Sequence, residues 1–132
     1  MPSAPFKIVV VEDHAGVRKT VERILKAGGF AVVPFGSAEA ALEADAAASA
    51  DCLVLDISLP GMSGLDLYRR LALSNKVMPT VFMTAGDDPA VHEEAEKLAG
   101  VGSYLPKPFV GNDLLHGVTR ALGSDSGPTQ ER

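Results

Sequence analysis

The chain has 132 residues, which is enough for one domain with its own core and too few for two. Hydrophobic residues make up 46% of the chain and charged residues 22%, so it is neither wholly disordered nor fibrous. With 12 Lys and Arg against 17 Asp and Glu, the net charge is −5, and direct binding of this chain to nucleic acid is not expected.

The cysteine content and the absence of long apolar runs narrow the class of protein. Cys52 is the one cysteine, so an internal disulfide and a cysteine-based zinc site are excluded, and a small core residue is the simplest interpretation. No stretch approaches 18 apolar residues, and Met1–Phe6 does not resemble a signal peptide. We therefore expect a cytoplasmic protein without a membrane partner.

Short apolar runs alternate along the chain with segments whose apolar residues recur every three or four positions. The runs predict strands at Lys7–Val11, Phe30–Phe35, Cys52–Ile57, Pro79–Thr84 and Ser103–Leu105. The periodic segments predict helices that include Val17–Leu25, Ala38–Leu42, Leu65–Ala72, Val91–Ala99 and Leu114–Leu122. This alternation predicts an α/β doubly wound sheet with helices on both faces.

Three local features qualify this pattern. Pro34 interrupts the second run, which predicts an edge strand or a strand end. Ser37 precedes the second helix and is expected to cap it, and the alanine-rich residues 44–50 predict a weak helix end and a loop. Gly123–Arg132 has no apolar anchor and is expected to be a flexible tail or the start of a linker.

Polar residues gather where the predicted strands end. They are Glu12 and Asp13 after the first strand, Asp56 in the third, Thr84 in the fourth and Lys107 after the fifth. Ligands of an open parallel sheet bind beyond the carboxyl ends of its strands. If the strand order is 2-1-3-4-5, these strands are neighbours, and Asp13 and Asp56 come within reach of one shared ion.

The residue types at this edge indicate metal-assisted phosphoryl chemistry. Gathered carboxylates repel one another unless a cation neutralises them, and hard oxygen ligands favour Mg²⁺. Asp56 is then a candidate nucleophile, with Lys107 and Thr84 available to the phosphoryl oxygens. Each residue alone is more often a helix cap or turn residue, and it is their joint placement that favours a phosphoryl site.

Several motifs together resemble a known family. They are Val9–Asp13, Leu53–Asp56, Pro60–Gly64, Met83–Ala85 and Lys107–Phe109. In order, spacing and strand position they resemble the response regulator receiver domain of two-component signalling, over residues 6–122. The Glu-Asp opening, the P-G-M-S-G loop and the K-P-F ending are similar to the nitrogen-fixation regulator (FixJ-like) subfamily, whose members usually carry a C-terminal helix-turn-helix.

The resemblance implies a flavodoxin-like (CheY-like) doubly wound sheet of five parallel strands, in the order 2-1-3-4-5, with five helices. It implies a receiver domain at residues 6–122 that accepts a phosphoryl group on Asp56 from a sensor histidine kinase or a phosphotransfer protein. Such a receiver is not a conventional enzyme, although it assists its own Mg²⁺-dependent phosphorylation and dephosphorylation.

The resemblance also assigns roles to individual residues. The Mg²⁺ ligands are Glu12 (largely through water), Asp13, Asp56 and the backbone carbonyl of Ser58. Thr84, Ala85 and Lys107 contact the phosphoryl oxygens, the Lys107–Pro108 bond is cis, and Thr84 and Tyr104 form the switch. Phosphorylation then rearranges the face of the fourth helix, fifth strand and fifth helix, which binds a target or a second copy of the chain.

Alternative functions remain at this point. The chain can be a receiver that acts alone, or the receiver fragment of a DNA-binding transcriptional regulator whose helix-turn-helix is absent from it. A nucleotide-binding enzyme would need a Gly-rich loop where Glu12–Gly16 stands. A phosphatase of the haloacid dehalogenase type would need an acid at Ser58. His14, His92 and His116 are expected on the solvated surface.

Overall fold

The computed structural model describes residues 5–74, 78–85, 88–99 and 104–126. The strands are β1 (Lys7–Val11), β2 (Ala31–Phe35), β3 (Cys52–Asp56), β4 (Thr80–Thr84) and β5 (Tyr104–Pro106). The helices are α1 (Ala15–Ala27), α2 (Ala38–Glu43), α3 (Gly64–Leu73), α4 (Pro89–Ala99) and α5 (Gly111–Ser126), with a 3₁₀ turn, η1, at Ala46–Ser49.

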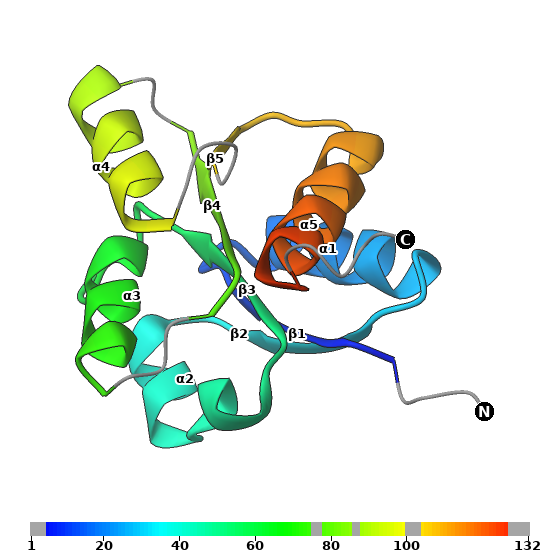
Figure 1. The fold of residues 1–132 in the computed structure, drawn as a ribbon, viewed down its shortest axis with the longest axis horizontal. Coiled ribbons are helices and arrows are strands. Elements are labelled where there is room, and N and C mark those ends of the chain that lie inside the picture. The colour runs from blue at the N-terminus through cyan, green and yellow to red at the C-terminus, as the bar shows by residue number, and fades with distance from the viewer. Residues whose placement is uncertain (1–4, 75–77, 86–87, 100–103, 127–132) are drawn as a thin grey trace.

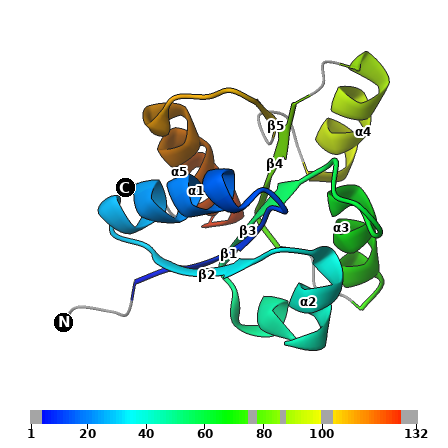
Figure 2. The same cartoon turned by 180° about the vertical axis from the view of Figure 1, so that it is seen from behind.

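Within the described residues, the strands form one parallel sheet in the order β2-β1-β3-β4-β5. Helices α1 and α5 cover one face of this sheet, and α2, α3 and α4 cover the other (Figures 1 and 2). This arrangement confirms the predicted fold and strand order. No helix among the described residues is long and apolar enough to cross a membrane.

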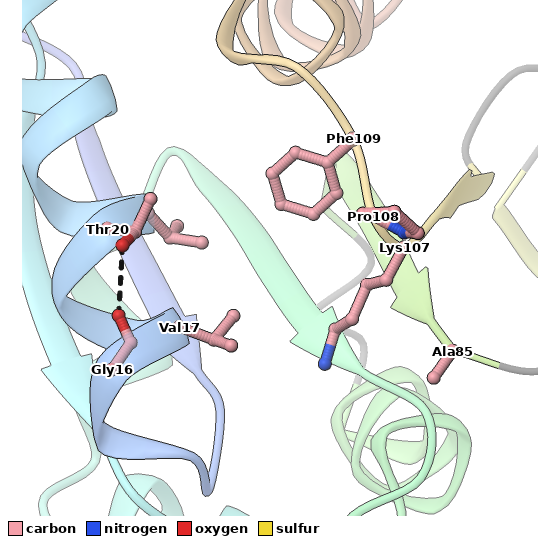
Figure 3. Close-up of a pocket in the computed structure, with 8 residues that line it drawn as sticks. Gly16, Val17, Thr20, Ala85, Lys107, Pro108 and Phe109 are labelled. Atoms are coloured by element: carbon pink, nitrogen blue, oxygen red, sulfur yellow. Dashed lines mark hydrogen bonds between the residues drawn. The ribbon is translucent and has the colours of Figure 1, made fainter.

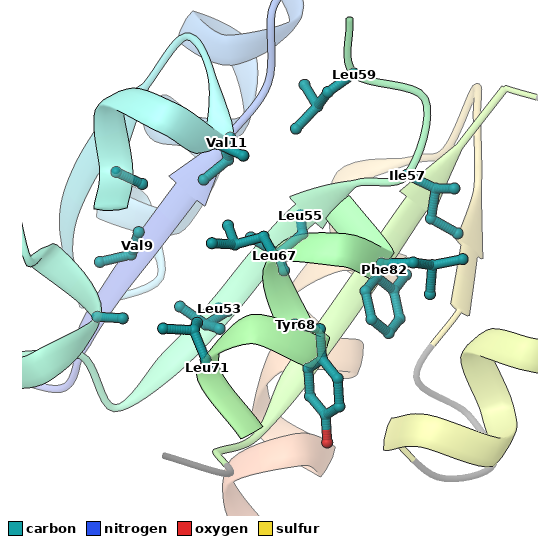
Figure 4. Close-up of a cluster of buried hydrophobic side chains, with 14 of the residues drawn as sticks. Val9, Val11, Leu53, Leu55, Ile57, Leu59, Leu67, Tyr68, Leu71 and Phe82 are labelled. Carbon is teal, nitrogen blue, oxygen red and sulfur yellow. The ribbon is translucent and has the colours of Figure 1, made fainter. Parts of the chain in front are cut away.

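The period-two alternation of each strand divides the core into two layers. Val9, Leu53 and Leu55 point towards α2 and α3, where Tyr68 packs edge-on against Phe82 with ring centroids 5.7 Å apart (Figure 4). The intervening residues face α1 and α5; they include Ile8, Val10, Cys52, Val54, Val81 and Met83. With both faces covered, β1, β3 and β4 hold their carboxyl ends in a fixed register.

The sheet ends in β2 on one side and β5 on the other. Pro34 lies in β2 opposite Val10, and Pro106 lies in β5 opposite Thr84. Each edge strand therefore contains a proline, a residue that sheets tolerate at their edges because it has no N–H to donate. The prediction that Pro34 marks an edge strand is confirmed.

Local capping follows the sequence closely. The hydroxyl of Ser37 accepts a hydrogen bond from the Ala40 N–H at 3.0 Å, which confirms the predicted N-cap. The alanine-rich segment forms the 3₁₀ turn η1.

The last helix extends further than the apolar pattern that predicted it. Helix α5 continues to Ser126, beyond Leu122, because Gly123 and Ser124 can keep helical geometry at modest cost. Residues 127–132 and Ser103 lie outside the described residues. The boundary at Leu122 and the flexible tail stay predictions.

Candidate functional site

Glu12 follows β1 and is fully buried. Its backbone N–H donates to the carbonyl of Phe35 at 3.0 Å, and its carboxylate accepts a hydrogen bond from the His14 N–H at 3.0 Å. The guanidinium of Arg18, on α1, donates to the Glu12 carbonyl at 2.8 Å. The loop after β1 is thus tied both to β2 and to α1, which fixes the buried carboxylate in place.

Asp56 ends β3, with only 3% of its surface exposed. One carboxylate oxygen, Oδ1, accepts a hydrogen bond from the Ser58 N–H at 2.9 Å. At Gly64 a Cβ atom would lie 2.4 Å from the Asp56 carbonyl oxygen, so α3 begins against the backbone of Asp56. The predicted phosphoacceptor is thus held from both sides of the loop that follows it.

Lys107 joins the two buried carboxylates. Its Nζ lies 2.7 Å from Glu12 Oε1 and 3.1 Å from Asp56 Oδ2. Burial lowers the pKa of Lys107, but hydrogen bonds to Glu12 and Asp56 outweigh it, and the pKa lies above its usual value. The Lys107 N–H donates to the Thr84 carbonyl at 2.7 Å, and the Lys107–Pro108 bond is cis. The site therefore holds a fixed ammonium between its acids.

The β4–β5 side of the site carries the predicted switch residues. Thr84 is buried at the end of β4, and Ala85, the next residue, is exposed. Tyr104, at the start of β5, is half-buried, and its ring stacks on that of His92 from α4, with centroids 3.7 Å apart and planes 13° apart. Nε2 of His92 lies 3.2 Å from Glu96 Oε2.

Ligand atoms of Glu12, Asp13 and His14 lie within 4.8 Å of one another. Asp13 is exposed, and no described residue donates a hydrogen bond to its carboxylate. Asp56 is not part of this group, and the exposed carboxylate of Asp13 beside the buried Glu12 offers oxygen donors that suit a hard cation such as Mg²⁺. Sharing of one ion between Asp13 and Asp56 stays a prediction.

A pocket of about 520 Å³ opens beside the site. Val17 and Thr20 of α1 form one wall, and Phe109 forms the opposite wall (Figure 3). The amine of Lys107 extends into the space between these walls. Sequence reasoning did not predict this pocket, because it depends on how α1 and the segment after β5 approach each other.

Three further residues with contacts at the site were also missed. Arg18 contacts the loop after β1, Glu39 contacts the loop after β3, and His92 stacks on Tyr104. The sequence predicts that His92 lies on the solvated surface. In the structure His92 is partly buried, and its ring stacks on that of Tyr104. No local pattern marks these residues, since each reaches its partner across the fold.

The sequence profile of the response regulator receiver domain matches residues 8–119. Nodulation protein W of Bradyrhizobium diazoefficiens is 37% identical over 118 residues, covering 89% of this chain and 52% of that protein. Transcriptional regulatory protein FixJ of the same organism is 33% identical over 115 residues, covering 87% of this chain and 56% of that protein. This chain spans about half the length of these curated relatives.

Solved structures of response regulators are also similar to this chain. The response regulator StyR superposes with a TM-score of 0.80 at 34% identity, covering 96% of this chain and 64% of that one. The structure of FixJ-N gives a TM-score of 0.79 at 31% identity, covering 92% and 95% of the two chains. The motifs, the fold and the relatives converge, and the chain belongs to the response regulator receiver domain family.

Proposed function

We propose that Asp56 accepts a phosphoryl group from the phosphohistidine of a histidine kinase or a phosphotransfer protein. The observation that carries this proposal is the contact of Lys107 Nζ with both Glu12 and Asp56 at the carboxyl edge of the sheet. A buried carboxylate beside a fixed ammonium is suited to receive a group that carries negative charge. Membership of the receiver family supports the same role.

In the transfer step, an Asp56 carboxylate oxygen attacks the phosphorus. The oxygen–phosphorus bond forms, and the bond from phosphorus to the donor imidazole nitrogen breaks, with its electron pair passing to that nitrogen. We assign Lys107, Thr84 and Ala85 to contacts with the phosphoryl oxygens, whose charge they would stabilise. Lys107 and Ala85 also line the pocket beside the site.

We assign Mg²⁺ binding to Asp13, Asp56 and the Ser58 carbonyl, with Glu12 acting largely through water. When bound, the ion neutralises the carboxylates and the phosphoryl oxygens, which lets the two groups approach each other. The exposed carboxylate of Asp13, beside the buried Glu12, supports this assignment. The same residues would let the receiver assist its own phosphorylation and dephosphorylation.

Treatment with acetyl phosphate and Mg²⁺, followed by intact-mass measurement, tests the proposal. The wild-type chain is expected to gain one phosphoryl group, and chelation of Mg²⁺ should prevent the gain. Asp56→Asn should remain unmodified, whereas Asp113→Asn, on the exposed side of α5, should react like the wild type. Modification of Asp56→Asn at the wild-type rate would sink the assignment.

A second proposal concerns the output of the receiver. The curated relatives are about twice as long as the matched region, and FixJ is named a transcriptional regulatory protein. This chain is then the receiver part of a transcriptional regulator, with a DNA-binding domain supplied by further sequence. Reading the gene beyond the codon for Arg132 tests this directly; a stop codon there would favour a receiver that acts by protein contact.

Phosphorylation is proposed to act through Thr84 and Tyr104 on the face formed by α4, β5 and α5. Tyr104 already links β5 to α4 through His92, so a change in its position is felt by both elements. Light scattering with and without beryllofluoride measures whether this face joins two copies. A mass that doubles with beryllofluoride supports dimerisation, and an unchanged mass argues against self-association of this chain through that face.

A further inference from the structure

We propose that Glu39 is a positioning residue for the phosphoryl site, holding the loop after Asp56 in the geometry that metal binding requires. The proposal rests on the function assigned above to Asp56 and Ser58. Glu39 lies on α2, outside every motif of the family resemblance, and no role follows for it from the sequence. Its significance comes from one contact across the fold.

The carboxylate of Glu39 reaches the middle of the loop between β3 and α3. Its Oε2 accepts a hydrogen bond from the Met62 N–H at 2.9 Å. This bond is the main reason that the pKa of Glu39 lies below its usual value, since a hydrogen bond to the charged form stabilises it. The contact therefore favours an ionised Glu39 at neutral pH.

Gly61 shows how closely the two groups fit. A Cβ atom added there would lie 2.7 Å from Glu39 Oε2, and Gly61 has a φ of +74°, in the left-handed region that favours glycine. The Glu39 carboxylate thus occupies the space that any side chain at position 61 would fill. The absence of a side chain there lets the carboxylate approach the loop backbone.

Helix α2 gives Glu39 a firm base, although the helix is short. Ser37 caps its first turn, and Ala38 and Ala41 are buried against the core. The loop is also held by hydrogen bonding and close packing at its two ends. Ser58 donates to Asp56 at one end, and Gly64 packs on the Asp56 backbone at the other. In the middle, Leu59 is buried in the core and the Met62 side chain packs against it, while Glu39 takes the hydrogen bond of the Met62 backbone.

The loop matters because it carries Ser58, whose carbonyl is assigned to the metal. A carbonyl ligand must keep its direction within narrow limits, and side chains that orient a ligand from behind change metal affinity when removed. Releasing Met62 removes the backbone hydrogen bond from the part of the loop that follows Leu59, so that the loop is held less firmly. The direction of the Ser58 carbonyl then varies, and Mg²⁺ binding weakens without any loss of a ligand.

The experiment compares Glu39→Ala, Glu39→Gln and Glu43→Ala with the wild type. Glu43 ends the same helix and is exposed, so Glu43→Ala removes the same charge without touching the loop. The glutamine amide oxygen can still accept from the Met62 N–H and serves as the conservative rescue. Amide hydrogen exchange of Met62 reads the contact itself, and Mg²⁺ titration followed by NMR reads its effect on the site.

In Glu39→Ala we expect Met62 exchange to accelerate and the Mg²⁺ dissociation constant to rise, each by about tenfold. Glu39→Gln and Glu43→Ala should stay within about twofold of the wild type. Unchanged Met62 exchange in Glu39→Ala overturns the proposal, and so does faster exchange with unchanged Mg²⁺ affinity. Equal weakening in Glu43→Ala also overturns it, because the effect would then be one of charge.

Gly61→Ala provides an independent check. In the wild-type background the new methyl group displaces the Glu39 carboxylate, so Met62 exchange should accelerate as in Glu39→Ala. In the Glu39→Ala background no carboxylate is left to displace, so the same change should accelerate Met62 exchange less than in the wild type, and the remaining effect reports the strain of a side chain at a φ of +74°. Fully additive effects on exchange would contradict the proposal.

These readouts separate two failures. If acetyl phosphate does not modify the wild type, the function proposed for Asp56 fails, while Met62 exchange still reports on Glu39. If the wild type is modified and binds Mg²⁺ no better than Glu39→Ala, only the role of Glu39 fails.

Discussion

Two regions of the molecule differ in character. At β1 and β3, Glu12 and Asp56 are buried and share the ammonium of Lys107. At β5 and α4, Tyr104 and His92 are only partly buried and meet through their ring faces. The first region is held together by charge, and the second contains a ring contact between partly exposed side chains.

This difference suggests a division of labour. Buried charges must keep their partners, because an unpaired charge in the core is strongly unfavourable. A partly exposed aromatic contact can be exchanged for another at little cost, since water is available to the rings. The proposed phosphoryl site thus lies where the structure resists change, and the proposed switch lies where change is easy.

Replacing Lys107 gives the largest expected effect. Lys107→Met leaves the Glu12 and Asp56 carboxylates facing each other without a cation, which should lower the free energy of unfolding by about 3 kcal/mol. Urea denaturation measures this loss of stability. Adding Glu12→Gln to Lys107→Met removes one of the repelling charges and should recover part of the loss. An unchanged stability in Lys107→Met would show that the buried region is not fixed by charge.

A methyl group at Gly64 tests the packing behind Asp56. The new Cβ would lie 2.4 Å from the Asp56 carbonyl oxygen, so the backbone must shift, and we expect a loss of about 2 kcal/mol or more. Gly16→Ala is the matched control, because a Cβ there meets no atom within 4 Å. In helix α1 that change should stabilise the chain by about 0.5–1 kcal/mol. Thermal unfolding measures both changes: the midpoint should fall in Gly64→Ala and rise in Gly16→Ala.

The two ends of β3 differ. Asp56 at the carboxyl end is paired with Lys107, whereas Cys52 at the amino end is buried with no cation of the described residues beside it. Burial raises the pKa of its thiol to about 12 from 9.0, so the folded chain resists thiolate formation. The unfolded chain releases this proton near pH 9, and stability is therefore lost as the pH rises above that value. At pH 10 the loss should be about 1.4 kcal/mol.

The Cys52 effect can be isolated by difference. The stability of the wild type minus that of Cys52→Ala should fall between pH 8 and pH 10, and groups common to both chains cancel. A difference that does not change with pH would mean that charge is tolerated at both ends of β3.

The smallest expected effect is on the α4–β5 side. His92→Ala should lower the free energy of unfolding by about 0.5–1 kcal/mol, because it removes the ring stacked on Tyr104. His92→Phe keeps a flat ring and should recover most of this, whereas His116→Ala, exposed on α5, should have little effect. A loss in His92→Ala as large as in Lys107→Met would remove the contrast between the two regions.

Much of the fold follows from local sequence pattern. Apolar runs such as Lys7–Val11 predict strands because both faces of the sheet are covered, and Ser37 predicts a helix start by its hydroxyl. The placement of Asp56 and Lys107 at one edge follows from parallel strands alone.

Contacts between side chains far apart in sequence could not be predicted in the same way. Glu39 reaches Met62, and His92 reaches Tyr104, only through the rotamers and the relative positions of whole elements. The partners of Lys107 depend on the same details. The sequence predicts that its ammonium group contacts phosphoryl oxygens, and in the structure this group contacts Glu12 and Asp56. The spacing of apolar residues predicts which side chains are buried, but it does not predict which buried side chains contact one another.

The prolines of the two outer strands have a consequence for self-association. An exposed strand edge is a template on which another chain can add a strand. In the described sheet, Pro34 on β2 and Pro106 on β5 each break the row of N–H donors that such growth needs. Both borders thus disfavour β-augmentation and edge-to-edge aggregation, and two copies that associate are directed to their helices.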